Sequence, residues 1–437
     1  MVHTCELFLD LRTFDNAWNV LEQFGFSHDS ALSYLEESFN GIHNIYSIII
    51  TTARNCPNSG IHEIRINCYR FREYGDIITR YHLVIRMEPQ MMITQQRVID
   101  LFSVNPDNLQ RLRDAFHNVM SNIIDVPNSY LTDINSYSCR RIDYAINLDF
   151  SNGYDTFDRN IRATGETGNA ATKGFFDNNN HLYITAFSKD LNDAAEIFFC
   201  FTGATSTYCR RRKRTMWRES NQPYIDFEHI PDREQSTAEG NKSCKIHFYC
   251  KAAEVKNRYS DNDPQAYAQA IAASKNIIRF ELQCYPNKVR GLKNIWQLED
   301  GNFMNYLQPQ FIRDLLIKNY RQTIGLEDFY SFYHAQKIIN SSNRRAATKT
   351  KLINTLRLIA QARHVSKAKE QFIRGTRIKH TDIIVGGAAQ DTPETFNRYL
   401  RNIRELGINP FIIPKDWHIT RYRNPVYKIH EVFDGIC

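Results

Sequence analysis

The chain has 437 residues, of which 42% are hydrophobic and 24% are charged. This composition is typical of globular proteins and excludes a disordered chain, a collagen-like repeat and a coiled-coil rod. The 55 lysines and arginines outnumber the 48 aspartates and glutamates only slightly, so the formal net charge is +7. At about 150 residues per domain, this length predicts two or three domains.

The sequence contains no stretch of the roughly 18 to 20 apolar residues that a membrane-spanning helix requires. Its first residues, MVHTCELFLDL, carry acids within the apolar run, so a secretory signal is not expected. The ten cysteines form no C-x-x-C pair, which favours a reducing compartment and disfavours a zinc finger. We therefore expect a soluble, cytoplasmic protein without a membrane partner.

Four segments alternate apolar and polar side chains with a period of two, which predicts strands with one buried face. They are residues 79–88, 139–150, 244–251 and 276–284. If the four strands share a sheet, its apolar face packs on helices and its polar side chains meet on the other face. An antiparallel sheet with one solvated face and no site is the simpler alternative. The polar positions are Glu88, Asp143, Tyr249, Lys251, Arg279 and Glu281.

A long irregular stretch separates the second and third of these strands, and we interpret residues 151–240 as an insertion. Its glycines and lysines do not fit the spacing of a nucleotide-binding P-loop. It also contains five consecutive basic residues, a pattern that is usual in solvated loops and is also typical of phosphate-binding surfaces. These residues are Arg210, Arg211, Arg212, Lys213 and Arg214.

Beyond residue 300 the pattern becomes helical. Residues 351–363 place apolar side chains on one side of a helix, and Ser366 is a suitable N-cap for a second helix. Thr392 and Gly407 predict the start and the end of another helix, and residues 408–419 predict an extended closing segment. The first two helices form either a DNA-reading helix-turn-helix or a plain helical hairpin, and the sequence leaves both open.

The positive charge is concentrated in residues 344–379, which contain eleven lysines and arginines and a single acid. This segment carries +10, which leaves −3 for the rest of the chain. Such a segment favours binding to a polyanion. A membrane-surface helix is a weaker interpretation, because polar residues interrupt the segment and aromatic anchors are scarce in it. The side chains expected to contact DNA are Lys351, Arg357, Arg363, Lys367 and Lys369, together with the basic run at 210–214.

Tyr249 and Lys251 lie two residues apart on a predicted strand and therefore on one face. Tyrosine is a poor nucleophile because its pKa is about 10. A neighbouring ammonium and a metal-bound phosphate can nevertheless help the phenolate to form and attack phosphorus. Asp143 and Glu281, on neighbouring strands, offer the hard oxygen ligands that Mg²⁺ or Mn²⁺ prefers.

Three short motifs follow one another on these strands: RRIDYA at 140–145, FYCKAAE at 248–254 and RFEL at 279–282. In this order they resemble the replication initiators of rolling-circle plasmids and related phages. The resemblance covers roughly residues 75–300. It implies a DNA-nicking domain that is built on an antiparallel sheet and acts on a single-stranded or hairpin origin. A host helicase and a host polymerase would be its partners.

The resemblance also implies a role for each matching residue. Tyr249 would attack a DNA phosphodiester, forming a 5′-phosphotyrosine and a free 3′-OH primer. Asp143 and Glu281 would hold Mg²⁺ or Mn²⁺, and the segment VIRMEP at 84–89 adds Glu88 as a third ligand. Lys251 would assist the phenolate or the phosphate, and Glu254 and Arg279 would position the site.

The chain departs from the wider nicking superfamily in two ways. None of its 14 histidines form the His-apolar-His metal pair, which leaves the carboxylate-based branch of initiators. Asn147 stands where the family often has a second aspartate. These departures concern the geometry of the metal site more than the type of reaction.

We therefore expect an α+β protein. Residues 1–300 would form a catalytic domain with a mostly antiparallel sheet and helices on one face, and residues 301–437 a helical, basic DNA-binding or accessory region. A relaxase or transposase-like nickase with the same chemistry is one alternative. A non-enzymatic DNA-binding regulator is another, although it does not require an acid, a tyrosine and an acid on three strands. A homodimer is left open.

Overall fold

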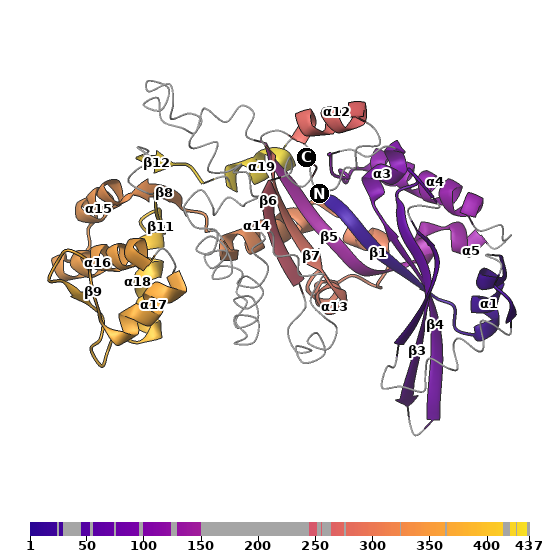
Figure 1. Ribbon diagram of the computed structural model, residues 1–437, viewed down its shortest axis with the longest axis horizontal. Helices are drawn as coiled ribbons and strands as arrows, with labels where there is room; N and C mark the ends of the chain where they lie inside the picture. The colour runs from indigo at the N-terminus through magenta and orange to yellow at the C-terminus, as the bar shows by residue number, and fades with distance from the viewer. Residues whose placement is uncertain are drawn as a thin grey trace.

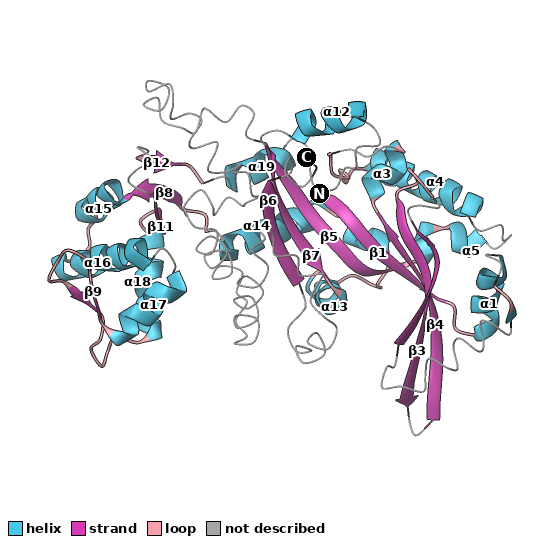
Figure 2. Ribbon diagram, in the orientation of Figure 1, coloured by secondary structure: helices cyan, strands magenta, loops and turns pink. Residues whose placement is uncertain are grey.

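The computed structural model describes residues 1–23, 26–28, 45–52, 56–73, 76–95, 99–123, 129–149, 244–250, 255, 264–274, 277–323, 325–362, 365–413, 420–424 and 426–434. The fold is α+β, as expected, with one large sheet and helices packed beside it (Figure 1 and Figure 2). The basic run at 210–214 lies outside the described residues. So do Lys251, Glu254 and Arg363.

The large sheet has seven strands in the order β2-β3-β4-β1-β5-β7-β6, and each neighbouring pair is antiparallel. The four predicted strands are confirmed as β4, β5, β6 and β7. Strands β1, β2 and β3 were not among them, although β1 is central and pairs with both β4 and β5. The strands are β1 (Val2–Asp10), β2 (Ile45–Thr52), β3 (Ile61–Glu73), β4 (Asp76–Met87), β5 (Ser138–Asp149), β6 (Cys244–Cys250) and β7 (Ile277–Cys284).

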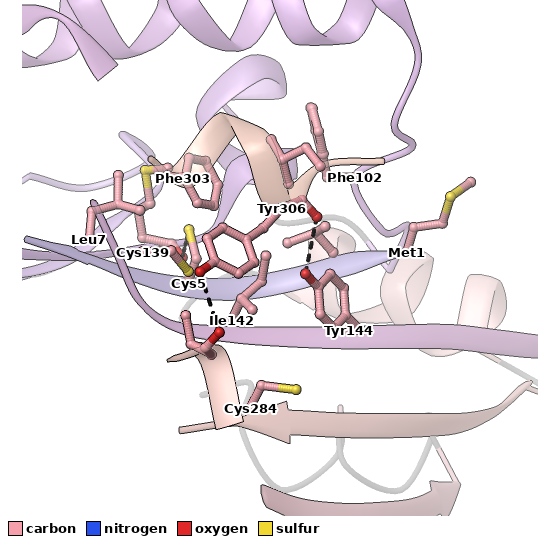
Figure 3. Packing of buried hydrophobic residues seen from close by; sticks show 14 of the residues in the cluster. Met1, Cys5, Leu7, Phe102, Cys139, Ile142, Tyr144, Cys284, Phe303 and Tyr306 are labelled. Atoms are coloured by element: carbon pink, nitrogen blue, oxygen red, sulfur yellow. Dashed lines mark hydrogen bonds between the residues drawn. The ribbon is translucent and has the colours of Figure 1, made fainter. Parts of the chain in front are cut away.

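One face of the sheet is apolar and forms the main core. Cys5, Ile142 and Tyr144 pack there with Phe303 and Tyr306, and the Tyr144 hydroxyl donates to the Tyr306 carbonyl at 3.0 Å (Figure 3). This burial follows directly from the alternation in the sequence, because removing an apolar face from water stabilises the fold. The elements around the sheet are α1 (Phe14–Gln23), α3 (Pro89–Thr94), α4 (Pro106–Ile123), α5 (Ser129–Thr132), η2 (Ile134–Ser136), α13 (Pro286–Ile295), η7 (Phe303–Tyr306), α14 (Pro309–Thr323) and α19 (Val426–Asp434).

The polar face is covered at one end by a small apolar cluster. Ile99, Val255 and Ala270 form this cluster, and Ile277 at the start of β7 packs against it. Ala270 belongs to α12 (Pro264–Ser274), which Figure 1 shows at the end of the sheet where β6 and β7 lie. Helices therefore cover mainly one face of the sheet, with this exception at one end.

A second core spans residues 335–408. It belongs to a smaller unit that contains a three-stranded sheet, in the order β11-β8-β12, and a short β9-β10 hairpin. Strand β11 falls within the extended segment expected at 408–419, whereas β8, β9, β10 and β12 correct the expectation of a mainly helical region beyond residue 300. The elements of this unit are β8 (Asp328–Ser331), α15 (Phe332–Ser341), α16 (Ala346–Ala362), α17 (Val365–Arg374), β9 (Thr376–Arg377), β10 (Ile384–Val385), α18 (Pro393–Arg404), β11 (Ile408–Ile413) and β12 (Arg421–Tyr422).

The main core also contains residues from beyond position 300. Ile312 and Leu316 of α14 belong to it, and Ile429 and Phe433 of α19 return to it from the end of the chain. Figure 1 shows α14 and α19 beside the large sheet, with α15 to α18 gathered at one end of the molecule. The boundary between the two cores therefore lies beyond residue 300, and the chain returns to the first core after it has formed the second.

The helices expected in the smaller unit are present, but α17 begins at Val365, so Ser366 lies within the helix and is not its N-cap. Helix α18 begins after Thr392, whose hydroxyl accepts from the Thr395 amide at 3.3 Å, and a left-handed Gly407 follows its end. Helix α16 is the centre of the second core, because Leu352, Leu356 and Leu358 are all buried. Among the described residues, no helix is long and apolar enough to cross a membrane.

Candidate functional site

The predicted site positions share the polar face of the large sheet. Asp143 of β5 lies opposite Gln283 of β7, two residues beyond Glu281. Tyr249 of β6 lies opposite Arg279, two residues before Glu281. Because residues two apart on a strand share a face, Asp143, Glu281 and position 249 follow one diagonal across β5, β7 and β6.

For Tyr249 the structure describes the backbone register, and its side chain lies outside the description. Lys251 and Glu254 follow the end of β6 and are not described. The order of acid, acid and tyrosine on three adjacent strands is thus present in the backbone. The roles that the resemblance implies for these residues stay predictions.

The Asp143 carboxylate is buried, with 1% of the residue exposed. Arg141, on the same strand, donates from Nε to Oδ1 at 3.0 Å and from Nη2 to Oδ2 at 2.9 Å. The hydroxyl of Thr4 on β1 also donates to Oδ2. A bidentate guanidinium is among the strongest partners of a carboxylate. Arg141 therefore supplies the positive charge that a buried aspartate requires.

The Glu281 carboxylate is nearly as buried, with 4% of the residue exposed. Its Oε1 accepts from Nε2 of Gln283 at 2.8 Å, and its Oε2 lies 3.2 Å from Nδ1 of His3. The Gln283 oxygen in turn accepts from the Tyr285 hydroxyl at 3.0 Å. Side chains from β1, β5 and β7 therefore assemble the site.

The two carboxylates are close enough to influence each other. Burial is the largest cause of the raised pKa of Asp143; Arg141 lowers this pKa and the negative charge of Glu281 raises it. Two buried carboxylates that repel each other attract a cation, and hard oxygen ligands suit Mg²⁺ or Mn²⁺. The ligand chemistry of this pair is therefore the part of the described site that best suits a metal.

The expected third ligand does not join this pair. The Glu88 carboxylate at the end of β4 lies 3.5 Å from Nε2 of His62. In the described parts of the chain, no group of three or more His, Cys, Asp or Glu side chains is arranged to hold a metal. Mg²⁺ is often bound by one or two carboxylates, with waters and substrate phosphates completing its shell. Asp143 and Glu281 fit that pattern once Arg141 yields an oxygen of Asp143.

Arg279 is buried and hydrogen-bonded to neighbouring elements of the fold. It is 1% exposed, its Nε donates to Oδ1 of Asn147 at 2.8 Å, and its Nη2 donates to the Ile99 carbonyl. These bonds tie β7 to β5 and to the segment that precedes α4. Asn147 is therefore engaged as the partner of Arg279.

The predicted DNA-binding side chains of the smaller unit differ in their exposure. Lys351 is exposed, whereas Arg357 and Lys369 are half-buried. The Arg357 guanidinium lies 5.5 Å from the centre of the Phe332 ring. For Lys367 the structure describes the backbone of α17 only.

Elsewhere on the polar face, His82 of β4 lies between two aromatic rings. Its ring centre is 5.1 Å from that of Phe8 and 4.7 Å from that of Tyr69. Burial is the largest cause of the lowered pKa of His82; Asp10 raises it, and two nearby arginines lower it. Folding therefore disfavours the protonated imidazole.

This burial predicts an acid-sensitive contribution to stability. Because the folded-state pKa of His82 is lowered, its contribution is present above the unfolded value of about 6.5 and is lost as the pH falls. The variant His82→Phe should lose less stability than the wild type between neutral and mildly acidic pH. The measurement is the fall in melting temperature from neutral to mildly acidic pH, compared between the wild type and the variant. An identical acid shift in both proteins would contradict the prediction.

The sequence did not identify three residues of the site as partners of the carboxylates. Arg141 is part of RRIDYA, but nothing local shows that its guanidinium binds Asp143. Thr4 and His3 come from β1, more than a hundred residues away along the chain. The alternation of Cys5 and Leu7 with polar neighbours was the available signal for that strand.

No protein-family model, curated protein or solved structure matches the chain.

Proposed function

We propose that the protein is a metal-dependent DNA-nicking enzyme that uses Tyr249 as its nucleophile and initiates rolling-circle replication. The observation that carries the proposal is the diagonal of Asp143, Glu281 and position 249 on one face of the sheet. A nucleophile and two carboxylates need this proximity to act on one phosphate. The resemblance in the motifs gives the same order of residues.

The reaction conserves the phosphodiester. The Tyr249 hydroxyl releases its proton and its oxygen forms a bond to phosphorus. The bond from phosphorus to the 3′ oxygen breaks, and that oxygen takes up a proton. The products are a 5′-phosphotyrosine and a free 3′-OH that a polymerase can extend. A divalent metal, when bound, would stabilise the charge that develops on the phosphate. A relaxase or a transposase-like nickase carries out the same step on another DNA substrate.

The buried carboxylates would hold the metal, and Arg141 would compete with the metal for the oxygens of Asp143. Its guanidinium occupies both oxygens of Asp143. We expect Arg141→Gln to raise the affinity for Mn²⁺ by about tenfold, since loss of a charge-assisted bond of this kind is worth about 1.5 to 3 kcal/mol. Titration of the DNA-free protein with Mn²⁺, followed by electron paramagnetic resonance, measures this.

The matched control for this titration is Arg313→Gln on α14, which removes a half-buried arginine away from the site. Equal Mn²⁺ affinity in the Arg141→Gln and Arg313→Gln variants would show that Arg141 does not compete for the site.

The nucleophile is tested by trapping the covalent product. Incubation with labelled single-stranded or hairpin DNA and Mn²⁺ should give a protein-DNA adduct that survives SDS. We expect Tyr249→Phe to form no adduct, because it lacks the attacking oxygen. The control Tyr333→Phe alters an exposed tyrosine on α15, 60% of which is accessible, and should form adduct at the wild-type level. Adduct formation by Tyr249→Phe would remove Tyr249 from the proposal.

One observation favours a non-enzymatic DNA-binding protein as the second candidate. Arg141 already neutralises Asp143, so the pair does not need a metal to be stable. Binding to DNA would then reside in basic surfaces such as that of the smaller unit. EDTA separates the two functions: an enzyme loses cleavage and retains binding, whereas a binding protein shows no cleavage with any metal.

A further inference from the structure

The smaller unit contains a shallow hollow of about 570 Å³ between α15, α16 and the β9-β10 hairpin. Sites for small molecules have volumes of roughly 300 to 1,000 Å³. Helix α15 contributes Phe332, helix α16 contributes Arg357 and Gln361, and the hairpin contributes Ile378 and Lys379. The hollow therefore draws on three elements.

Two cations line the hollow, Arg357 from the helix and Lys379 from the hairpin. Among the described residues that line it, none is acidic. The ion pair between Arg377 and Asp382 uses strongly exposed side chains of the hairpin that are not part of this lining. The charge inside the hollow is therefore positive and suits an anionic group such as a phosphate.

Gln361 fixes the hairpin against α16. Its Oε1 accepts from the Lys379 amide at 2.8 Å, and its Nε2 donates to the Arg377 carbonyl at 3.3 Å. The turn is tightened further because the Ile378 amide donates to the Ile383 carbonyl at 2.9 Å. The backbone of Lys379 is therefore held beside Arg357 before any ligand binds, which lowers the entropy that binding would lose.

The remaining wall of the hollow is apolar. Phe332, Ala360 and Ile378 supply it, and the Arg357 guanidinium lies over the Phe332 ring at 5.5 Å from its centre. An aromatic ring beside a guanidinium is a surface on which an unstacked base can lie. A base within a duplex is already stacked on its neighbours, so such a hollow favours a single strand.

We propose that this hollow binds one nucleotide unit of single-stranded DNA, with the base against Phe332 and Ile378 and the phosphate on Arg357 and Lys379. This inference rests on the proposed function only in taking DNA as the partner. The hollow is built from residues other than those of the sheet site. It adds Lys379 and Phe332 to the DNA contacts expected from the sequence.

The test uses the full-length protein and a fluorescein-labelled oligothymidylate, with binding followed by anisotropy at several KCl concentrations. We expect Arg357→Gln and Lys379→Gln each to weaken binding by about tenfold and to reduce the salt dependence by about one counterion. Phe332→Leu, which keeps an apolar side chain, should weaken binding by about fivefold without changing the salt dependence. The matched control is Arg398→Gln, an exposed cation on α18 outside the hollow.

Competition identifies the chemistry of the ligand. Thymidine 5′-monophosphate should displace the oligothymidylate better than thymidine or inorganic phosphate does, because it offers both base and phosphate. Equal displacement by thymidine, or by an acidic peptide of the same charge, would overturn the proposal. So would binding by Arg357→Gln and Lys379→Gln that matches the Arg398→Gln control.

Two measures separate this inference from folding and from the nicking proposal. Lys379 lies on an exposed hairpin, so Lys379→Gln should retain the wild-type melting temperature even if a change at the half-buried Arg357 perturbs the unit. Binding of oligothymidylate should persist in Tyr249→Phe. If no adduct forms but binding still depends on Lys379, the nicking function alone is rejected. If the adduct forms but binding does not depend on Lys379, the proposed role of the hollow alone is rejected.

Discussion

Replacing Asp143 with Asn or Glu281 with Gln is expected to slow DNA cleavage by about a thousandfold or more, while DNA affinity changes little. Both substitutions keep the shape of the side chain and remove the charge that would hold a metal beside the scissile phosphate. DNA affinity should survive because the predicted phosphate contacts lie elsewhere, in the smaller unit and the basic run at 210–214. Single-turnover cleavage with Mn²⁺ and a parallel anisotropy titration measure the two effects.

The control for this experiment is Asp314→Asn, which removes an exposed carboxylate on α14 that accepts from Gln310. This variant should cleave at the wild-type rate. Melting temperatures of all three variants exclude loss of the fold as the cause of a slow reaction. Full cleavage by both Asp143→Asn and Glu281→Gln would show that the carboxylate pair does not hold a catalytic metal.

Replacing Arg279 with Met is expected to lower the free energy of unfolding by about 3 kcal/mol, because the substitution leaves two buried acceptors without their donor. These acceptors are Oδ1 of Asn147 and the Ile99 carbonyl. For a chain of this size the melting temperature should fall by about 3 °C. Thermal unfolding followed by circular dichroism measures this change without any DNA substrate.

Arg290→Met, an exposed position on α13, serves as the matched control and should leave the melting temperature within about 1 °C of the wild type. The comparison also decides between two roles for Arg279. A stable Arg279→Met protein that has lost cleavage would place this guanidinium at the reacting phosphate, as the resemblance implies. A destabilised protein supports the bridge between β5, β7 and Ile99.

Four of the seven strands of the large sheet were predictable because they carry strict alternation. In β4, Leu83, Ile85 and Met87 are all buried, as the pattern of that segment predicts. The same pattern gave β5, β6 and β7, and with them the shared face of Asp143 and Glu281. Alternation reports which side chains are buried together, and it therefore locates a polar face before any tertiary contact is known.

The partners of those carboxylates were not predictable in the same way. Strand pairing between β1 and β5 joins residues more than a hundred positions apart, and a short sequence carries no direct signal for that register. The Thr4 and His3 contacts depend on it. The bidentate contact of Arg141 with Asp143 depends on rotamers, which a motif does not specify.

Several features of the smaller unit could not be predicted from the sequence either. The apolar stripe of α16 was recognised, but Leu352, Leu356 and Leu358 are buried on more than one side because other elements surround the helix. Strands of two to four residues such as β9 and β8 are too short to give a periodic signal. Consequently the hollow beside Arg357 becomes visible only when the hairpin is placed next to α16.

The most direct measurement of the central claim is peptide mapping of the covalent adduct. The protein is incubated with an origin-containing or hairpin DNA and Mn²⁺, digested with nuclease and protease, and analysed by mass spectrometry. We predict that one peptide carries a residual nucleotide through its 5′-phosphate and that fragmentation places it on Tyr249. A nucleotide on any other residue, or cleaved DNA without a linked peptide, would contradict the account.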